Sequence, residues 1–289
     1  MSTDVASSET APTGGTWSPP STGGLRKALV DGATVAKRNL IKIKRVPDLL
    51  VFSTISPIMF ILLFGYIFGS AIKAPPGVGY REYLIPGIFA QTVIFGVTVT
   101  GAGLADDIQK GIIDRFRSLP MSRSAVLVGR TTSDVLNNVL VVVIMSLTGL
   151  IIGWRIRTSV GEALGGFVLL LLFAYAMSWI MALVGLLVPS PEVVNNASFI
   201  VIFPLTFIAN TFVPTKNFPS VLRVIANWNP VTTVTQAARQ LFGNTGTAPL
   251  PTDPWSLHHP ILYTLCWVVG ILVVFVPLSV RQYKRAAAR

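Results

Sequence analysis

Cysteine is almost absent from this sequence of 289 residues, in which Cys266 is the only one. A single cysteine cannot form a disulfide within the chain, and it cannot build a metal site from several thiolates. Because Cys266 stands within an apolar run, we interpret it as a small buried hydrophobic residue.

Two motifs typical of enzymes are also absent. The sequence has no Gly-x-x-x-x-Gly-Lys-Ser/Thr pattern, which excludes that kind of phosphate-binding loop. Its two histidines, His258 and His259, are not part of a His-Glu-x-x-His pattern, and we expect no metal site.

Acidic residues are few, and they avoid the apolar parts of the chain. All 12 of them fall outside six apolar runs or at the edge of a run. A charge at the centre of a membrane costs about 2.5–3.5 kcal/mol on insertion scales. This distribution favours a membrane protein over a soluble domain, even though the chain carries a net charge of +11.

The apolar runs are each about the length of a membrane-spanning helix, for which ~20 residues suffice. The runs are 49–72, 84–105, 132–153, 163–188, 193–213 and 259–280. Polar residues and a proline interrupt the fifth run, at Asn195, Asn196, Pro204 and Asn210. We predict an all-α membrane protein with six transmembrane helices.

Lysine and arginine are distributed unevenly between the segments that join these runs. If the N-terminus is cytoplasmic, 16 of the 23 basic residues lie on the inner side and 7 on the outer side. Since short cytoplasmic loops carry the excess of positive charge, both termini are predicted to be cytoplasmic.

The chain before the first run divides into two parts. Residues 1–24 are rich in Ser, Thr, Pro and Gly, and we predict a disordered cytoplasmic tail. Residues 25–45 place apolar residues on one stripe of a helix and basic residues opposite, which is typical of a helix lying in the membrane interface. The alternative is an ordinary helix packed on another domain.

The inner loop after the second run combines apolar and charged residues. We predict a short helix with a hydrophobic surface and a charged rim, suited to docking into a groove on a partner protein. The alternative is a helix on the membrane surface. Its residues are Ile112, Ile113, Asp114, Arg115, Phe116, Arg117, Leu119, Pro120 and Met121.

The long segment 214–257 follows the fifth run on the outer side. It contains two amphipathic stretches of helix length that are too short and polar to span a membrane. Together with the interrupted fifth run, they predict a re-entrant outer gate containing Asn229 and Pro230. The alternative is a simple interfacial cap.

These segments carry a family resemblance over residues 25–289. The patterns are Asp114-Arg-Phe-Arg-Ser-Leu-Pro-Met-Ser-Arg123, Gly129-Arg130, Asn210-Thr-Phe-Val-Pro214, Phe218-Pro219, Asn229-Pro230 and Ala238-Arg-Gln-Leu241. In this order they resemble the permeases of type-2 ABC exporters, most closely the daunorubicin-resistance permease group.

The resemblance implies a type-2 transporter domain of a bacterial plasma membrane. It implies a connecting helix, six spans, a coupling helix that docks on a separate ATPase, two re-entrant helices before the last span, and a dimer of permeases. ATP and magnesium would then be bound by the partner, with no cofactor on this chain. The family exports drugs, lipids and glycoconjugates, which leaves the cargo open.

We therefore predict the permease subunit of an ATP-driven exporter rather than an enzyme. Uncharged polar residues of the first, second and fifth runs are the candidates for its translocation path, and they suit an amphipathic or lipid-like cargo: Ser53, Ser56, Gln91, Thr92, Asn195, Asn196 and Asn210.

Two alternatives come from other classes. An intramembrane transferase would use Asp106, Asp107 and His258 or His259, and it requires these residues to face one cavity. A secondary transporter would normally show an ionisable residue deep in a span, and the runs contain none.

Overall fold

The computed structural model describes residues 48–69, 71–111, 125–188, 190–247 and 254–286. Within these ranges the chain is helical and has no strand, which confirms the all-α prediction. The predicted tail (1–24), interfacial helix (25–45) and docking segment (112–121) lie outside the described residues.

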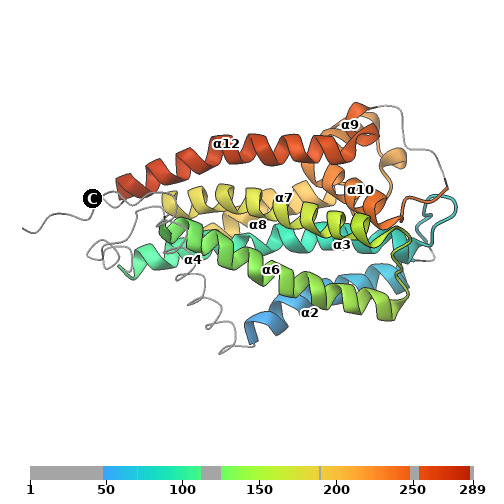
Figure 1. The fold of residues 1–289 in the computed structure, drawn as a ribbon, viewed down its shortest axis with the longest axis horizontal. Helices are drawn as coiled ribbons and strands as arrows, with labels where there is room; N and C mark the ends of the chain where they lie inside the picture. Colours follow the sequence, from blue (N-terminus) through green and yellow to red (C-terminus); the bar gives the residue numbers. More distant parts are fainter. Residues whose placement is uncertain (1–47, 70, 112–124, 189, 248–253, 287–289) are drawn as a thin grey trace, which may run out of the picture.

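The helices form an elongated bundle (Figure 1). In chain order, its elements are α2 (Asp48–Leu62), the π-helical turn η1 (Leu63–Ile67), α3 (Tyr80–Gly96), α4 (Thr98–Gln109), α6 (Ala125–Ile152), α7 (Val160–Leu187), α8 (Pro191–Phe207), the 3-10 turn η2 (Thr215–Asn217), α9 (Ser220–Trp228), α10 (Pro230–Phe242), α11 (Trp255–His258) and α12 (Pro260–Ala286).

Four helices in the described part of the chain are long and apolar enough to cross a membrane. They are Tyr80–Gln109, which combines α3 and α4, Leu127–Ile152, Val160–Leu187 and Pro260–Tyr283. Two shorter apolar helices, Thr54–Ile67 and Pro191–Phe207, occupy the first and fifth predicted runs. The long apolar helices support a multi-pass membrane protein.

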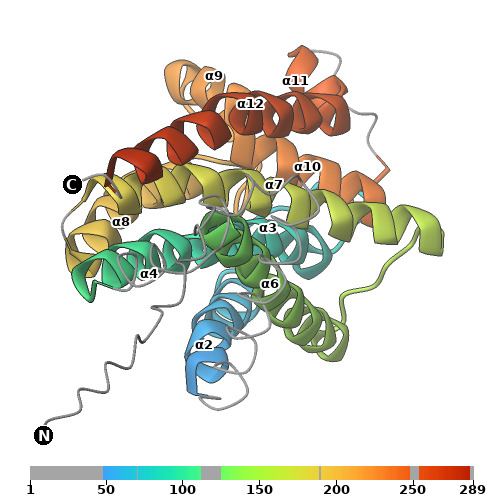
Figure 2. The same cartoon turned by 60° about the vertical axis from the view of Figure 1, so that its left-hand side comes forward.

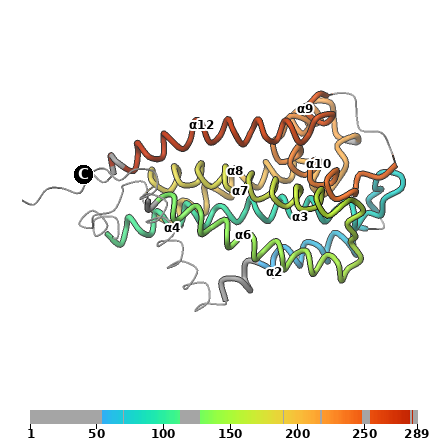
Figure 3. Tube along the Cα trace, in the orientation of Figure 1, coloured from blue at the N-terminus to red at the C-terminus, as the bar shows by residue number. Residues whose placement is uncertain are grey.

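Helix α7 is the centre of the bundle, between α12 on one side and α3, α4 and α6 on the other (Figures 2 and 3). Its contact with α4 depends on two glycines, because a Cβ on Gly185 would overlap the carbonyl oxygen of Gly101. Small residues allow helix backbones to approach closely where both partners are apolar.

The two ends of the bundle differ in structure. The short helices α9 and α10 gather at one end, which we name the α10 end (Figure 1). Helix α4 and helix α12 both finish at the opposite end, which we name the α4 end. The span formed by α3 and α4 is interrupted between the ends, at Val97.

The prediction that Cys266 is buried is wrong, because its side chain is exposed on α12. It shares a face of that helix with Leu262, Val269 and Val273, which are exposed as well. An apolar run alone does not distinguish a helix face that is buried in protein from one that contacts lipid, since both are hydrophobic.

Candidate functional site

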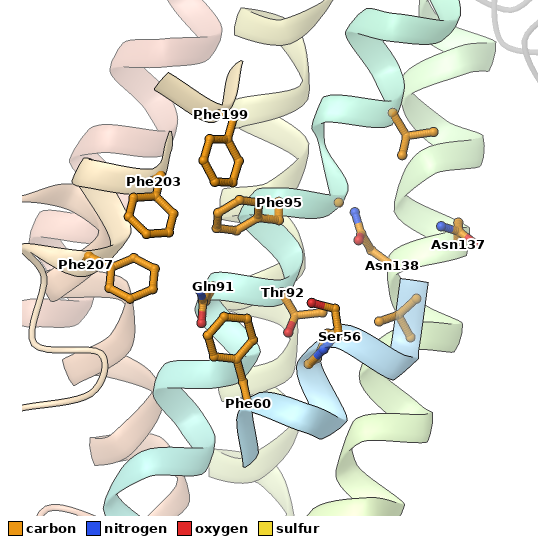
Figure 4. Close-up of a pocket in the computed structure, with 14 residues that line it drawn as sticks. Ser56, Phe60, Gln91, Thr92, Phe95, Asn137, Asn138, Phe199, Phe203 and Phe207 are labelled. Atoms are coloured by element: carbon orange, nitrogen blue, oxygen red, sulfur yellow. The ribbon is translucent and has the colours of Figure 1, made fainter. Parts of the chain in front are cut away.

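A cavity of about 400 Å³ lies between α2, α3, α6 and α8 (Figure 4), a volume within the usual range of ligand pockets, roughly 300–1,000 Å³. Five phenylalanines and five uncharged polar residues account for most of its lining, and none of the described residues that line it is charged. The cavity is therefore suited to a largely apolar molecule with a few hydrogen-bonding groups.

Phenylalanines of α8 form one wall of this cavity. Phe199, Phe203 and Phe207 recur every four residues, so they lie on one helix face. Their rings stack in a column, with centroids 5.0 Å apart for the first pair and 4.1 Å apart for the second. Phe95 of α3 and Phe60 of α2 complete the aromatic lining (Figure 4). Aromatic rings of this kind pack favourably against flat apolar groups.

Amide side chains are most of the polar residues that line the cavity. Gln91 and Asn138 are almost fully buried, and the Oε1 atom of Gln91 has no hydrogen-bond partner among the described residues. Asn138 of α6 lies beside Gly96, the last residue of α3. A Cβ on Gly96 would come within 2.5 Å of the Oδ1 atom of Asn138. Glycine at position 96 thus makes room for the amide beside the break in the second span.

Part of the predicted translocation path lies at this cavity. Ser56, Gln91 and Thr92 line it together, although they come from two different helices. Ser53 lies in the first turns of α2, and its side chain is outside the described part of the structure.

The other residues of the predicted path from α8 lie away from this cavity. Asn195 and Asn196 are exposed near the start of α8 and do not line the cavity. Asn137 and Asn138 line it but were not among the predicted residues. The signal for them was available, because two adjacent asparagines stand inside the apolar run 132–153.

A second polar site lies at the α10 end, and Arg239 is its centre. This side chain is fully buried. Its Nε atom donates a hydrogen bond to the carbonyl oxygen of Tyr83 (2.8 Å), and its Nη2 atom donates to the carbonyl oxygens of Asn210 (2.8 Å) and Thr211 (3.0 Å). Within the described ranges no carboxylate forms an ion pair with it. Arg239 therefore ties α10 to α3 and to the chain that follows α8.

The predicted gate residues belong to this same site. Asn229 caps α10, since its Oδ1 atom accepts a hydrogen bond from the backbone N–H of Val231 (2.8 Å). Its Nδ2 atom donates to the carbonyl oxygen of Leu205 in α8 (2.7 Å). Pro230 is the first residue of α10, where its missing N–H is tolerated. We name Asn210, Asn229, Arg239 and Tyr83 the polar junction.

The polar junction satisfies the backbone where α8 ends. The side chain of Asn210 donates to the Oε1 atom of Gln236 (3.3 Å), and its backbone N–H donates to the hydroxyl of Thr232 (3.2 Å). The hydroxyls of Tyr80 and Tyr83 donate to the carbonyl oxygens of Phe212 (3.0 Å) and Asn210 (3.2 Å). Non-helical backbone at membrane depth requires such partners, because lipid cannot supply them.

An ion pair lies near the surface at the same end. Glu82, at the start of α3, accepts a hydrogen bond from Nη2 of Arg157 in the α6–α7 connection (2.9 Å). This hydrogen bond and the negative charge of Glu82 raise the pKa of Arg157 above its ordinary value. The guanidinium is solvent-exposed, so the pair contributes little to stability.

Comparison with known protein families identifies the family of this chain. Residues 32–242, which include every residue of the cavity and of the polar junction, match the family described as ABC-2 type transporter. The chain belongs to the ABC-2 type transporter family. This result confirms the resemblance inferred from the sequence motifs.

Relatives of this ABC-2 family chain include named permeases. It is 33% identical over 251 residues to the daunorubicin resistance ABC transporter permease protein DrrB1 of Streptomyces coeruleorubidus, which covers 87% of this chain and 85% of the relative. It is 22% identical over 232 residues, 80% of each chain, to the probable doxorubicin resistance permease DrrC of Mycobacterium tuberculosis H37Rv. It is 26% identical over 216 residues, 73% of each chain, to the putative transport permease ycf38 of Cyanophora paradoxa.

The geometry of this ABC-2 family chain disfavours the transferase alternative. Asp106 and Asp107 lie in the last turn of α4, whereas His258 and His259 lie at α11, near the opposite end of the bundle (Figure 1). They do not face one cavity. Among the described residues no group of three or more His, Cys, Asp or Glu side chains could hold a metal ion.

Proposed function

We propose that this chain is the membrane permease subunit of an ATP-driven ABC exporter that moves an amphipathic drug, lipid or glycoconjugate out of the cytoplasm. The observation that carries the proposal is the uncharged cavity of about 400 Å³, lined by aromatic rings and amides, in a chain of the ABC-2 type transporter family. This lining has no charged side chain among the described residues, and it can hold an amphipathic molecule through apolar contacts and hydrogen bonds.

The topology we propose has six spans in a bacterial plasma membrane. Helix α2 with η1, and helix α8, are the short first and fifth spans, and the four long helices are the others. The charge distribution of the sequence supports cytoplasmic termini, and it puts the α10 end outside. Residues 1–24 are then a cytoplasmic tail, and the transporter domain, 25–289, begins with the interfacial helix 25–45.

The energy source in this proposal is a separate ATPase subunit that binds ATP and magnesium. The segment Ile112–Met121 docks on it as a coupling helix, since its apolar residues stand within a charged rim. A second permease, identical or paralogous, completes the transporter. The names of the relatives, which are permease proteins of ABC transporters, support this assembly.

The cavity and the polar junction have different roles in the proposed transport: the cavity binds the cargo, and the junction closes the outer end. Cargo enters the cavity between α2, α3, α6 and α8, where the column of phenylalanines on α8 contacts its apolar part and Gln91 and Asn138 bind its polar groups. The polar junction closes the outer end, with α9 and α10 as re-entrant helices. Export then requires that the junction open while α8 and α10 stay in the membrane.

Efflux from cells that express the chain with its ATPase tests this assignment of the cavity. We would measure efflux of daunorubicin and of a fluorescent phospholipid for Phe203→Ala, Asn138→Leu and the control Val269→Ala. Losing one aromatic contact or one hydrogen bond costs about 1 kcal/mol, which raises the half-saturating concentration about fivefold. Val269 is exposed on α12, so its variant should match the wild type. Equal kinetics in all the variants would refute the cavity as the path.

A further inference from the structure

A cluster of charged side chains lies near the α4 end, apart from the cavity and the polar junction. The Nε atom of Arg130 in α6 lies 3.5 Å from Oδ2 of Asp134, and its Nη1 atom lies 3.8 Å from Oδ2 of Asp107 in α4. All three side chains are largely buried, at 13–17% exposure. The cluster is therefore an ion-pair network inside the bundle rather than a surface pair.

Hydrogen bonds reinforce this network across the same two helices. The hydroxyl of Thr100 donates to Oδ2 of Asp134 (2.6 Å), and the Nη2 atom of Arg130 donates to the carbonyl oxygen of Val99 (3.1 Å). Thr100, Gly103 and Asp107 share one face of α4, because they are three and four residues apart. Helices α4 and α6 are thus joined over two turns.

Glycine at position 103 is a requirement of this arrangement. A Cβ at that position would overlap the guanidinium of Arg130. The planar group lies directly against the backbone of α4, where a larger residue would displace it. A change at this glycine can therefore separate the guanidinium from its partners without removing any charge.

The cluster joins the two helices that flank the proposed coupling segment in the sequence, and both helices also line or adjoin the cavity. Asp107 comes shortly before residues 112–124 and Arg130 shortly after them. Val99, whose carbonyl accepts from Arg130, also lines the cavity. Asn138, one turn beyond Asp134 on α6, lines it as well. Each helix therefore runs directly from the cluster to the cavity.

We propose that Arg130 is a positioning residue that makes α4 and α6 move as one unit, so that a displacement of residues 112–124 changes the cavity. This inference rests on the proposed function, because it assumes that an ATPase acts on that segment. Separating the helices would break the pair of Arg130 with Asp107 and the hydrogen bonds from Arg130 to Val99 and from Thr100 to Asp134, while Arg130 would keep Asp134 on its own helix. Loss of these contacts between largely buried polar groups is unfavourable. In this proposal α4 moves relative to α3 at Val97, where the helix is interrupted, so that the motion reaches the cavity instead of rotating the whole span.

Four variants separate this role from a merely structural one. Arg130→Ala removes the guanidinium, and Arg130→Lys keeps a positive charge without the planar fork. Gly103→Ala keeps every charge but displaces the guanidinium. The control is Lys110→Ala, which breaks the exposed pair between Lys110 and Asp106 on the same helix (2.7 Å).

The measurement is the distance between spin labels on α2 and α8, with and without ATP, in the complex of the chain with its ATPase. Cysteines at the exposed residues Ile55 and Ile200 carry the labels in a Cys266→Ser background. In the wild type, ATP should increase the fraction of molecules in which the two labels are separated by a second, different distance. In Arg130→Ala and Gly103→Ala the shifted population should fall about tenfold, the middle of the usual range of coupling strengths. Arg130→Lys should recover part of it.

ATP hydrolysis and ATPase binding are measured as well, to separate a loss of coupling from a loss of the complex. ATP hydrolysis and the amount of ATPase bound should stay within about twofold of wild type in every variant, since the cluster does not contact the partner in this proposal. An ATP-dependent shift that is intact in Gly103→Ala, or equally lost in Lys110→Ala, would overturn the role of Arg130. The role of Arg130 would also be overturned if the variants formed so little folded complex that this alone explained the missing shift. Failure of the wild type to bind an ATPase would refute the proposed function instead.

Discussion

The guanidinium of Arg239 lies 3.5 Å from the centre of the Tyr83 ring, and its Nε atom donates to the carbonyl oxygen of the same residue. These residues are 156 positions apart in the sequence. The ring face attracts the cation, and carbonyls of α3 and of the chain after α8 accept hydrogen bonds from its Nε and Nη2 atoms, which offsets part of the cost of its burial. Arg239 therefore links α3, α10 and the chain after α8 within the polar junction.

Replacing Arg239 should destabilise the protein. Arg239→Leu removes three donated hydrogen bonds from buried carbonyls. The carbonyl oxygen of Asn210 keeps the hydroxyl of Tyr83 as a donor, so fewer than three groups lose a sole partner, at about 1–3 kcal/mol each. We expect the free energy of unfolding to fall by about 2–4 kcal/mol, which thermal unfolding in detergent would reveal. Arg239→Lys should be less severe, because lysine keeps the charge but not the fork.

The control for this experiment is Arg223→Leu. Arg223 is exposed on α9 and donates to the carbonyl oxygen of Phe218, so its loss should change stability by less than about 0.5 kcal/mol. Equal effects at the two arginines would show that burial of Arg239 does not hold the junction together.

The contact between Gly96 and Asn138 gives a prediction of non-additivity. Gly96→Ala forces a methyl group within 2.5 Å of the Asn138 Oδ1 atom, and overpacking of this kind costs about 1–3 kcal/mol. Truncating the amide in Gly96→Ala/Asn138→Ala should restore most of the lost stability. A double variant as unstable as the sum of the single ones would exclude the contact.

Membrane topology follows from the proposed orientation. In a Cys266→Ser background, a cysteine placed at Thr247, which is exposed beyond α10, should react with an impermeant reagent in intact cells. Cysteines at Ser118 and Ser124 should react only after the cells are opened. Labelling of position 118 from outside would contradict the six-span topology.

Docking of the ATPase gives a further prediction, at residues outside the described part of the chain. Phe116→Ala or Leu119→Ala should weaken recruitment of the ATPase by about 2 kcal/mol, or roughly 30-fold, whereas Arg117→Ala at the rim should have a milder effect. Co-purification of the ATPase with each variant measures this. Normal recruitment and normal efflux in the Phe116/Leu119 double variant would rule out the coupling helix.

The sequence predicted the helices directly, whereas the arrangement of side chains around the cavity and the polar junction depends on contacts between distant residues. Long apolar runs identify membrane helices because length and hydrophobicity set them directly, and Ser56, Gln91 and Thr92 stood out as polar residues inside such runs. The phenylalanines of α8 could not be separated from lipid-facing residues by composition. The burial of Arg239 could not be predicted, because it depends on contacts with residues such as Tyr83, which is distant in the sequence. The break at Val97 has no proline to mark it.

The most direct test of the central claim is transport into inside-out vesicles that contain the chain and its ATPase. We would measure the initial rate of daunorubicin and fluorescent phospholipid uptake with ATP, in the presence of an uncoupler that removes the proton gradient. The account predicts uptake of at least one probe that needs ATP and both proteins, with a half-saturating concentration raised about 25-fold in Gln91→Leu/Asn138→Leu. Uptake that follows the proton gradient and persists without ATP or without the ATPase would contradict it.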